Sequence, residues 1–122
     1  MQIGEVAARV GLSLRTIRHW DEVGLVVPSE RSAGGFRLYT EADVQRLELV
    51  KSLKPLDFSL EQIRELLATM DAAERGDDTP AVAARLATFR SAAHDRVEVL
   101  RAQVQGLEML TRELRRLTGP SA

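Results

Sequence analysis

Side chains rich in hydrogen-bond donors gather between residues 15 and 19, where the sequence reads Arg-Thr-Ile-Arg-His. A guanidinium group presents planar, permanently charged donors that suit a phosphate or the edge of a guanine. Arg15 and Thr16 lie near the start of an expected helix, where base edges are usually reached. Arg18 and His19 follow one turn later, and His19 is a candidate for contacting a phosphate. This pattern predicts a surface that binds nucleic acid.

Two short helices are expected to hold these donors. Residues 3–10 place apolar side chains at helical spacing, and Gly11 ends that helix. Ser13 can cap a second helix by accepting a hydrogen bond from a free amide, and Gly24 closes it. The expected inward face of the second helix consists of Leu14, Ile17 and Trp20. A short helix with an apolar back and a basic front, held at an angle by another helix, can enter the major groove of DNA.

An extended segment and a tight turn follow the second helix. The run Leu25-Val26-Val27-Pro28 is apolar, and its proline keeps the preceding residue out of helical angles. Gly34 and Gly35 then lie between Arg31 and Arg37. Residues 29–39 therefore predict a small β-hairpin with two extended arms around a Gly-Gly turn.

Two further helices are expected after the hairpin. Thr40 and Asp43 have the spacing of a capping box at the start of a helix that Pro55 breaks. Ser59 and Gln62 have the same spacing at the start of a shorter helix. The expected core positions of both helices are Val44, Leu47, Leu49, Val50, Leu53, Leu60, Ile63, Leu66 and Leu67. A domain of residues 1–70 would end here.

One long helix is predicted over residues 80–118, between a polar linker at 71–79 and a disordered tail at 119–122. Its apolar positions recur every 3.5 residues on average, which is the heptad period. They are Val82, Leu86, Phe89, Ala93, Val97, Leu100, Val104, Leu107, Leu110, Leu114 and Leu117. At about 1.5 Å per residue the helix would be roughly 55 Å long, too long for the first domain to cover. The expected partner is the same helix of a second copy.

Composition narrows the possible chemistry. The 122 residues include no cysteine, which excludes disulfides and thiolate metal sites. The two histidines, His19 and His94, fall in different expected elements, so we predict no metal site and no cofactor. We expect no enzyme, because the sequence has no Gly-rich phosphate loop and no nucleophile beside a base. A cytoplasmic protein without membrane contact is expected, since there is neither a long apolar run nor a leader.

The ordered set of short motifs resembles the MerR family of bacterial transcription regulators over nearly the whole chain. The matching runs are Ile3-Gly4-Glu5-Val6-Ala7, Val10-Gly11-Leu12-Ser13, Thr16-Ile17-Arg18, Gly24-Leu25, Pro28, Gly35-Phe36-Arg37-Leu38-Tyr39, Asp43 and Phe58-Ser59-Leu60-Glu61-Gln62-Ile63. The resemblance implies a mainly α fold, with a winged helix-turn-helix domain before a long dimerisation helix that forms an antiparallel coiled coil. It also implies a homodimer that binds double-stranded promoter DNA at a two-fold site. Such dimers bend and untwist the site so that RNA polymerase can engage the promoter, and some members only repress.

The family pattern assigns roles to individual residues. It makes Arg18 a DNA contact, against the alternative of a surface ion pair with Asp21 or Glu22. It carries contacts with the DNA backbone to Arg37 and Tyr39, although Tyr39 is alternatively a core ring. The remaining candidates for contacts with DNA are Ser13, Arg31 and Lys54. Ser13 is alternatively only a helix cap, and Lys54 only a solvated helix end.

The sequence departs from the family pattern in three places. His19-Trp20-Asp21 replaces the common Tyr-Tyr-Glu, so an imidazole takes the place of a phenol at a phosphate contact. Asp57 replaces the usual glycine before Phe58, which predicts a less tight turn. Family members that bind drugs carry a separate C-terminal ligand domain, and members that bind metals carry cysteines near the end of the long helix. The sequence shows neither feature. We therefore expect a short form of regulator to which no effector can be assigned.

A second interpretation is that the chain has the same fold but does not bind DNA. The formal net charge is −1, and residues 41–75 hold more acidic than basic side chains. A protein-interaction adaptor, in which the long helix recruits a partner, is therefore the alternative. DNA binding is favoured over it because Arg15, Arg18, Arg31 and Arg37 cluster locally, and local placement matters more than net charge for a phosphate contact.

Overall fold

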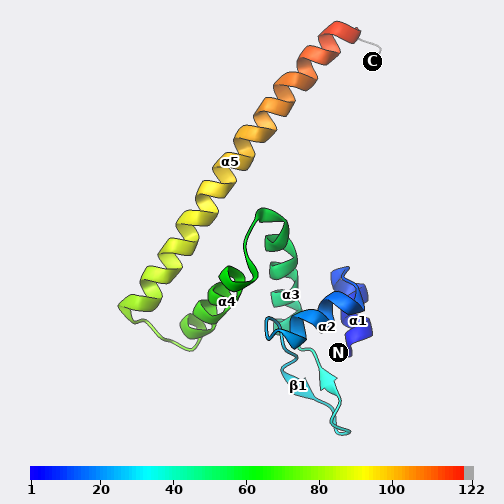
Figure 1. Ribbon diagram of the computed structural model, residues 1–122, viewed down its shortest axis with the longest axis vertical. Helices are drawn as coiled ribbons and strands as arrows, with labels where there is room; N and C mark the ends of the chain where they lie inside the picture. Colours follow the sequence, from blue (N-terminus) through cyan, green and yellow to red (C-terminus); the bar gives the residue numbers. More distant parts are fainter. Residues whose placement is uncertain (120–122) are drawn as a thin grey trace. The chain divides into compact units, whose positions relative to one another are not determined.

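The computed structural model describes residues 1–119 and divides the chain into two compact units, residues 1–71 and the residues from Ala72 onward. In chain order the elements are α1 (Ile3–Val10), α2 (Leu14–Glu22), β1 (Glu30–Arg31), β2 (Arg37–Leu38), α3 (Glu41–Leu53), the 3-10 helix η1 (Lys54–Leu56), α4 (Leu60–Glu74) and α5 (Pro80–Thr118) (Figure 1). The tail expected at 119–122 lies, beyond Gly119, outside the described residues. The mainly helical fold with a hairpin and a long last helix is confirmed.

The helix-turn-helix follows the prediction closely. Helix α1 has the predicted bounds, and Gly11 ends it with a φ of 70°, a left-handed conformation that glycine adopts without steric cost. The amides of Gly11 and Leu12 both donate to the carbonyl of Ala7. Ser13 is the N-cap of α2, as expected. The break between the two helices is therefore short and held by backbone hydrogen bonds.

The predicted hairpin is present but its strands are short. Strand β1 pairs antiparallel with β2, with Glu30 opposite Leu38 and Arg31 opposite Arg37. Gly35 has a φ of 83° in the connecting turn. The apolar segment before the hairpin forms no strand, because Leu25 and Val26 turn into the core instead. Within the described residues, the two hairpin strands form a sheet of their own beside the helical core.

One core holds the first unit together. Its buried apolar residues are Val6, Val10, Ile17, Trp20, Leu25, Val26, Tyr39, Val44, Leu47, Val50, Ile63 and Leu67. Trp20 was predicted to face inward, and it is buried. The prediction that Leu14 faces inward is wrong, since its side chain is 40% exposed. Leu14 is the first residue of α2, so it precedes the part of the helix that the other elements cover.

Both predicted capping boxes are present at the starts of α3 and α4. Asp43 and Thr40 exchange hydrogen bonds of 2.9 and 3.1 Å, and Gln62 and Ser59 exchange bonds of 2.8 and 3.0 Å. These reciprocal bonds satisfy amides that the first turn of a helix leaves free. Between the two helices, Asp57 has a φ of 63° and so takes the left-handed conformation usual for glycine, which aspartate tolerates better than most residues.

The predicted linker is shorter in the structure than in the sequence interpretation. Helix α4 continues to Glu74, and the break before α5 spans only residues 75–79. The linker was predicted from its polar composition. Residues 71–74, however, contain no helix-breaking residue, and the first such residue is Gly76, with a φ of 88°. Asp71, expected in the linker, instead forms an ion pair with Arg46 of α3.

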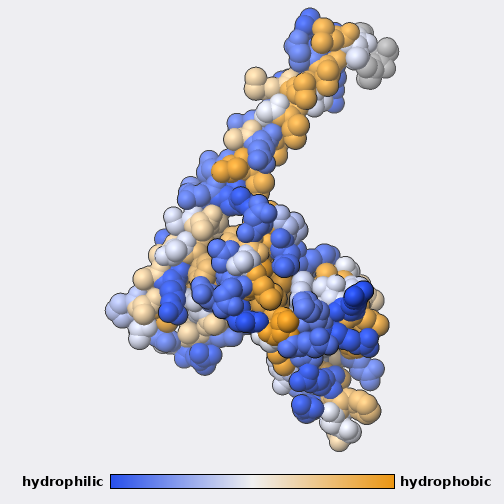
Figure 2. All heavy atoms as spheres, in the orientation of Figure 1, coloured by the Kyte–Doolittle hydropathy of each residue, from blue (hydrophilic) through white to orange (hydrophobic). Residues whose placement is uncertain are grey.

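Helix α5 is a single helix of 39 residues that contains no buried residue. Thr79 caps it and Pro80 occupies the first turn, as predicted. Apolar side chains gather along the helix between hydrophilic ones (Figure 2). Among the described residues, no helix has the length and apolar character needed to cross a bilayer.

Candidate nucleic-acid interface

The outer face of α2 carries the predicted donors. Ser13 Oγ accepts a hydrogen bond from the Thr16 amide at 3.0 Å and donates to Thr16 Oγ1 at 2.9 Å, so its role as a cap is confirmed. The donor side chains of Arg15, Arg18 and His19 are exposed and make no ion pair or hydrogen bond within residues 1–119. Free donors on a helix with a packed back have the arrangement that a groove contact requires.

Arg18 does not form the ion pair considered as its alternative. Asp21 pairs with Arg37 of the hairpin instead. Glu22 has no ion pair in the part of the chain that the structure describes. The guanidinium group of Arg18 is therefore available to a ligand.

The hairpin presents two arginines in different states. Arg31 donates to the carbonyl of Gly35 at 3.2 Å and so stays on the hairpin. Arg37 is bound to Asp21 of α2, yet half of its side chain remains exposed. This ion pair joins the hairpin to the helix that carries Arg18. The sequence interpretation missed it, because the two residues are 16 positions apart and in different elements.

An exposed aromatic residue at the hairpin turn was also missed. Phe36 is 72% exposed. Its carbonyl accepts from the amide of Ser32 at 2.8 Å, and its own amide donates to Ser32 Oγ at 3.2 Å. These bonds fix the backbone of the turn and leave the ring outside. A large apolar side chain next to Gly35, in a turn too short to reach a core, was the available signal in the sequence.

Asp43 anchors the base of the hairpin. Besides the amide of Thr40, its carboxylate accepts from the amide and hydroxyl of Ser29 at 2.9 and 2.6 Å. Burial raises the pKa of Asp43, but the hydrogen bonds from Ser29 and Thr40 outweigh burial and hold the pKa below its ordinary value. The capping role was predicted, whereas the link to Ser29, which lies just before β1, was not.

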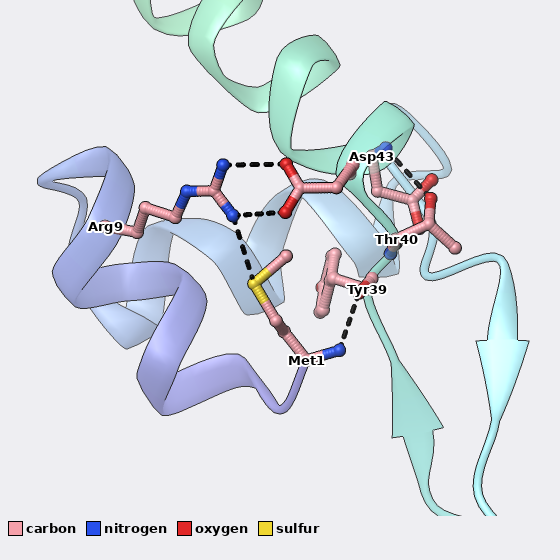
Figure 3. A network of polar contacts seen from close by, with 6 residues as sticks. Met1, Arg9, Tyr39, Thr40 and Asp43 are labelled. Atoms are coloured by element: carbon pink, nitrogen blue, oxygen red, sulfur yellow. Dashed lines mark hydrogen bonds and ion pairs between the residues drawn. The ribbon is translucent and has the colours of Figure 1, made fainter.

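Tyr39 lies at the exit of the hairpin. Its ring is only 3% exposed, so the core alternative is correct for the ring. The backbone of Tyr39 exchanges hydrogen bonds with Met1, and Figure 3 shows Met1 beside Arg9, whose guanidinium binds Glu41 at 2.5 and 2.7 Å. Burial and the charge of Asp21 raise the pKa of the Tyr39 phenol. No described side-chain oxygen is both buried and unpaired, so the hydroxyl, which has no partner in residues 1–119, reaches the surface.

Two cations hold the C-terminal ends of the helix-turn-helix. Lys51 of α3 donates to the carbonyl of Val10 at 2.7 Å, and Arg64 of α4 donates to the carbonyl of Val23. The carbonyls at a helix end lack intrahelical partners and carry partial negative charge, which a cation stabilises. These contacts fix the angle of α1 and α2 to the rest of the unit. Pairs 41 residues apart gave no sequence signal.

Lys54 lies across a cleft from α2. The cleft has a volume of ≈ 440 Å³ and separates α2 from the end of α3, η1 and the start of α4. Arg15, Thr16 and His19 line one side, and Lys54 lines the other. Lys54 is exposed and makes no ion pair within the described residues. The structure therefore brings four predicted contact residues together around one depression.

The heptad positions of α5 fall into two groups by exposure. Val82, Leu86 and Phe89 are half-buried. From the middle of the helix onward the positions are exposed, namely Val97, Leu100, Val104, Leu107, Leu110, Leu114 and Leu117. His94 is exposed. Within residues 1–119, no group of three histidine, cysteine, aspartate or glutamate side chains could hold a metal ion.

Two family models match the chain. The model described as "MerR HTH family regulatory protein" covers residues 1–70, and the model described as "MerR, DNA binding" covers residues 44–117. The first contains the helix-turn-helix, the hairpin, α3 and most of α4, and the second runs from within α3 to the penultimate residue of α5. Together they cover both units of the chain.

Individual relatives agree with the family models. The heavy metal-dependent transcription regulator 2 of Rhizobium meliloti is 32% identical over 120 residues, which cover 98% of this chain and 75% of the relative. The transcriptional activator TipA of Streptomyces coelicolor is 43% identical over 65 residues, 53% of this chain and 26% of TipA. The chain thus spans about a quarter of the length of TipA.

One similar solved structure is a complex with DNA. HiNmlR, described as a MerR family regulator that lacks the sensor domain and is bound to promoter DNA, matches with a TM-score of 0.67 and 26% identity. The match covers 92% of this chain and 85% of HiNmlR.

Proposed function

This chain belongs to the MerR family of helix-turn-helix regulatory proteins, and on that premise we propose that it is a transcription regulator that binds a two-fold promoter site as a homodimer. Bound there, it bends and untwists the DNA and so controls RNA polymerase at that promoter. Its place of action is the cytoplasm, where the chromosome lies. The likeness to HiNmlR, whose structure holds promoter DNA, supports the proposal.

The observation that carries the DNA contact is the free basic face of α2. Arg15, Arg18 and His19 are exposed without partners in the described chain, while Ile17 and Trp20 fix the helix from behind. We assign α2 to the major groove, with Arg15 and Thr16 at base edges and Arg18 and His19 at phosphates. The remaining backbone contacts in the proposal are Ser13, Arg31, Arg37, Tyr39 and Lys54.

The dimer is supported by α5. A helix in a protein gains most of its stability from packing against other elements. Helix α5 contains no buried residue within the described chain. Its heptad-spaced apolar side chains are those expected of a two-stranded coiled coil. We propose that residues 80–118 pair with the same helix of a second copy in the antiparallel sense, and that residues 1–70 form the DNA-binding domain.

Arg18→Ala tests the placement of α2. We expect promoter binding at low salt to weaken on the order of tenfold or more, because a charge-assisted contact is lost in each half-site. The slope of log K against log salt should become shallower by about two units per dimer if both contacts are to phosphates. Fluorescence anisotropy with labelled promoter DNA over a salt series measures both quantities.

Arg75→Ala is the matched control for Arg18→Ala. It also removes one exposed arginine, but from the segment between α4 and α5, so affinity should change little. Equal binding by the Arg18 variant and the wild type would show that α2 does not enter the groove.

Asp21→Asn is expected to tighten DNA binding about threefold to tenfold and to steepen its salt dependence. The substitution removes the carboxylate that holds Arg37 and so frees a guanidinium group for phosphate. Glu22→Gln removes the same charge from the same helix without touching Arg37, and it should have a smaller effect. Weaker binding by the Asp21 variant would mean that the ion pair persists on DNA and positions Arg37 there.

A further inference from the structure

The cleft beside α2 has an apolar interior. Leu12, Trp20, Pro55 and Leu60 form its walls, and its volume of ≈ 440 Å³ falls in the range of small-molecule sites, about 300–1,000 Å³. Trp20 and Leu60 come from elements on opposite sides, so a flat molecule could contact both. A DNA backbone would satisfy the charged rim of such a cleft but would leave these walls without an apolar partner.

The charge around the cleft has one sign. Arg15 and the ring of His19, which offers an N–H donor, line its α2 side, Lys54 lines the opposite side, and none of the described acidic residues lines it. None of these three side chains has a partner within residues 1–119. This bias is notable in a chain with a formal net charge of −1. An anionic group at the rim would find several donors that already lack other bonds.

We propose that this cleft binds an amphipathic organic anion, with a flat apolar body between Trp20 and Leu60 and a carboxylate or phosphate at Lys54, His19 and Arg15. The ligand is thus identified as a small aromatic or cyclic acid by the combination of apolar walls and a cationic rim. Binding of the acid does not depend on the proposed function. Its consequence does, because the acid would use donors that DNA needs and would release the promoter by direct competition.

The single tryptophan of the chain makes the site directly observable. Its indole N–H gives one signal in a nitrogen-proton correlation spectrum of the full chain, and Trp20 lies in the cleft wall. We expect 1-naphthoate to shift this signal saturably. The neutral alcohol 1-naphthalenemethanol, which has the same ring system, should bind about tenfold more weakly because it lacks the charge-assisted hydrogen bonds.

Two variants separate the cleft from the rest of the DNA surface. Lys54→Ala should weaken 1-naphthoate severalfold, because one of its charged partners is lost, and should leave binding of the alcohol unchanged. Arg31→Ala removes a cation from the hairpin, outside the cleft, and should leave 1-naphthoate binding unchanged while weakening DNA. Added 1-naphthoate should also displace labelled promoter DNA from the wild-type protein.

Each outcome decides a different statement. An unmoved Trp20 signal, or an equal response to the acid and the alcohol, overturns the site. A signal that responds to DNA but not to 1-naphthoate overturns it too and leaves the cleft to the DNA strand. If the acid and DNA bind at the same time, the proposed competition between them for the same donors is overturned. If the protein binds the acid saturably but does not bind DNA, the site is supported and the proposed function is overturned.

Discussion

Lysine at both Leu100 and Leu107 is expected to convert the protein to a monomer and to abolish its binding to a two-fold promoter site. The two leucines are one heptad apart on α5 and are 38% and 64% exposed in the single chain. In a dimer each substitution occurs twice, so four apolar contacts are lost at about 2 kcal/mol each, before the cost of burying the new charges. Sedimentation velocity and a mobility-shift assay with the promoter measure the two effects.

Ala102 and Met109 provide the matched control for the leucine variant. They are also one heptad apart and exposed, but they lie off the predicted dimer face. Lysine at both positions adds the same charge to the same helix, and the dimer should survive. An intact dimer after the Leu100 and Leu107 substitutions would show that this face of α5 does not form the dimer interface. Binding to the two-fold site by a monomer would show that one helix-turn-helix suffices.

Asp43→Asn is expected to lower the free energy of unfolding by about 2–3 kcal/mol near neutral pH, since a buried carboxylate with charge-assisted hydrogen bonds is replaced by an amide that repels some of the same donors. DNA binding should fall as well, because Ser29 loses the bond that fixes the base of the hairpin. Urea unfolding followed by circular dichroism gives the first quantity, and anisotropy at a temperature where the variant is folded gives the second.

The pH dependence of the Asp43 effect has a definite sign. The pKa of Asp43 is lowered in the folded state, so its ionisation stabilises the fold above the unfolded pKa of about 3.9. That stabilisation is lost as the pH falls through the folded pKa. The gap in unfolding free energy between wild type and Asp43→Asn should therefore be constant near pH 7 and shrink below about pH 4. Asp78→Asn, at an exposed site, is the control, and a gap that widens in acid would refute the assignment.

Features encoded by neighbouring residues were the ones that the sequence predicted well. The left-handed turn at Gly11, the Ser13 cap and the two capping boxes depend on residues at most four positions apart. Such bonds form whenever the local backbone is helical, so residue type and spacing suffice to find them. The bounds of α1 and α5 were predicted for the same reason, because Gly11, Pro80 and Gly119 mark their ends.

Contacts between distant residues could not be predicted from spacing. Arg37 with Asp21, Lys51 with Val10 and Arg64 with Val23 all join different elements, and each depends on the angle at which those elements pack. Leu14 was misplaced for a related reason, since helical periodicity identifies a face but not how much of its length is covered. The length of α4 was underestimated because a polar composition was taken for a helix end.

The anchor formed by Asp43 ties the base of the hairpin to α3, whereas the described bonds of its tip stay within the hairpin. Ser29 and Thr40, which flank the hairpin, both bind this one carboxylate, whereas the turn at residues 32–36 is closed by bonds among its own residues and by Arg31 of β1. Insertions or deletions at the tip should consequently leave the rest of the domain intact, because loop length costs little once the ends are fixed. Under the proposed function, a change in tip length would then change which flanking base pairs the protein covers without any change to the core.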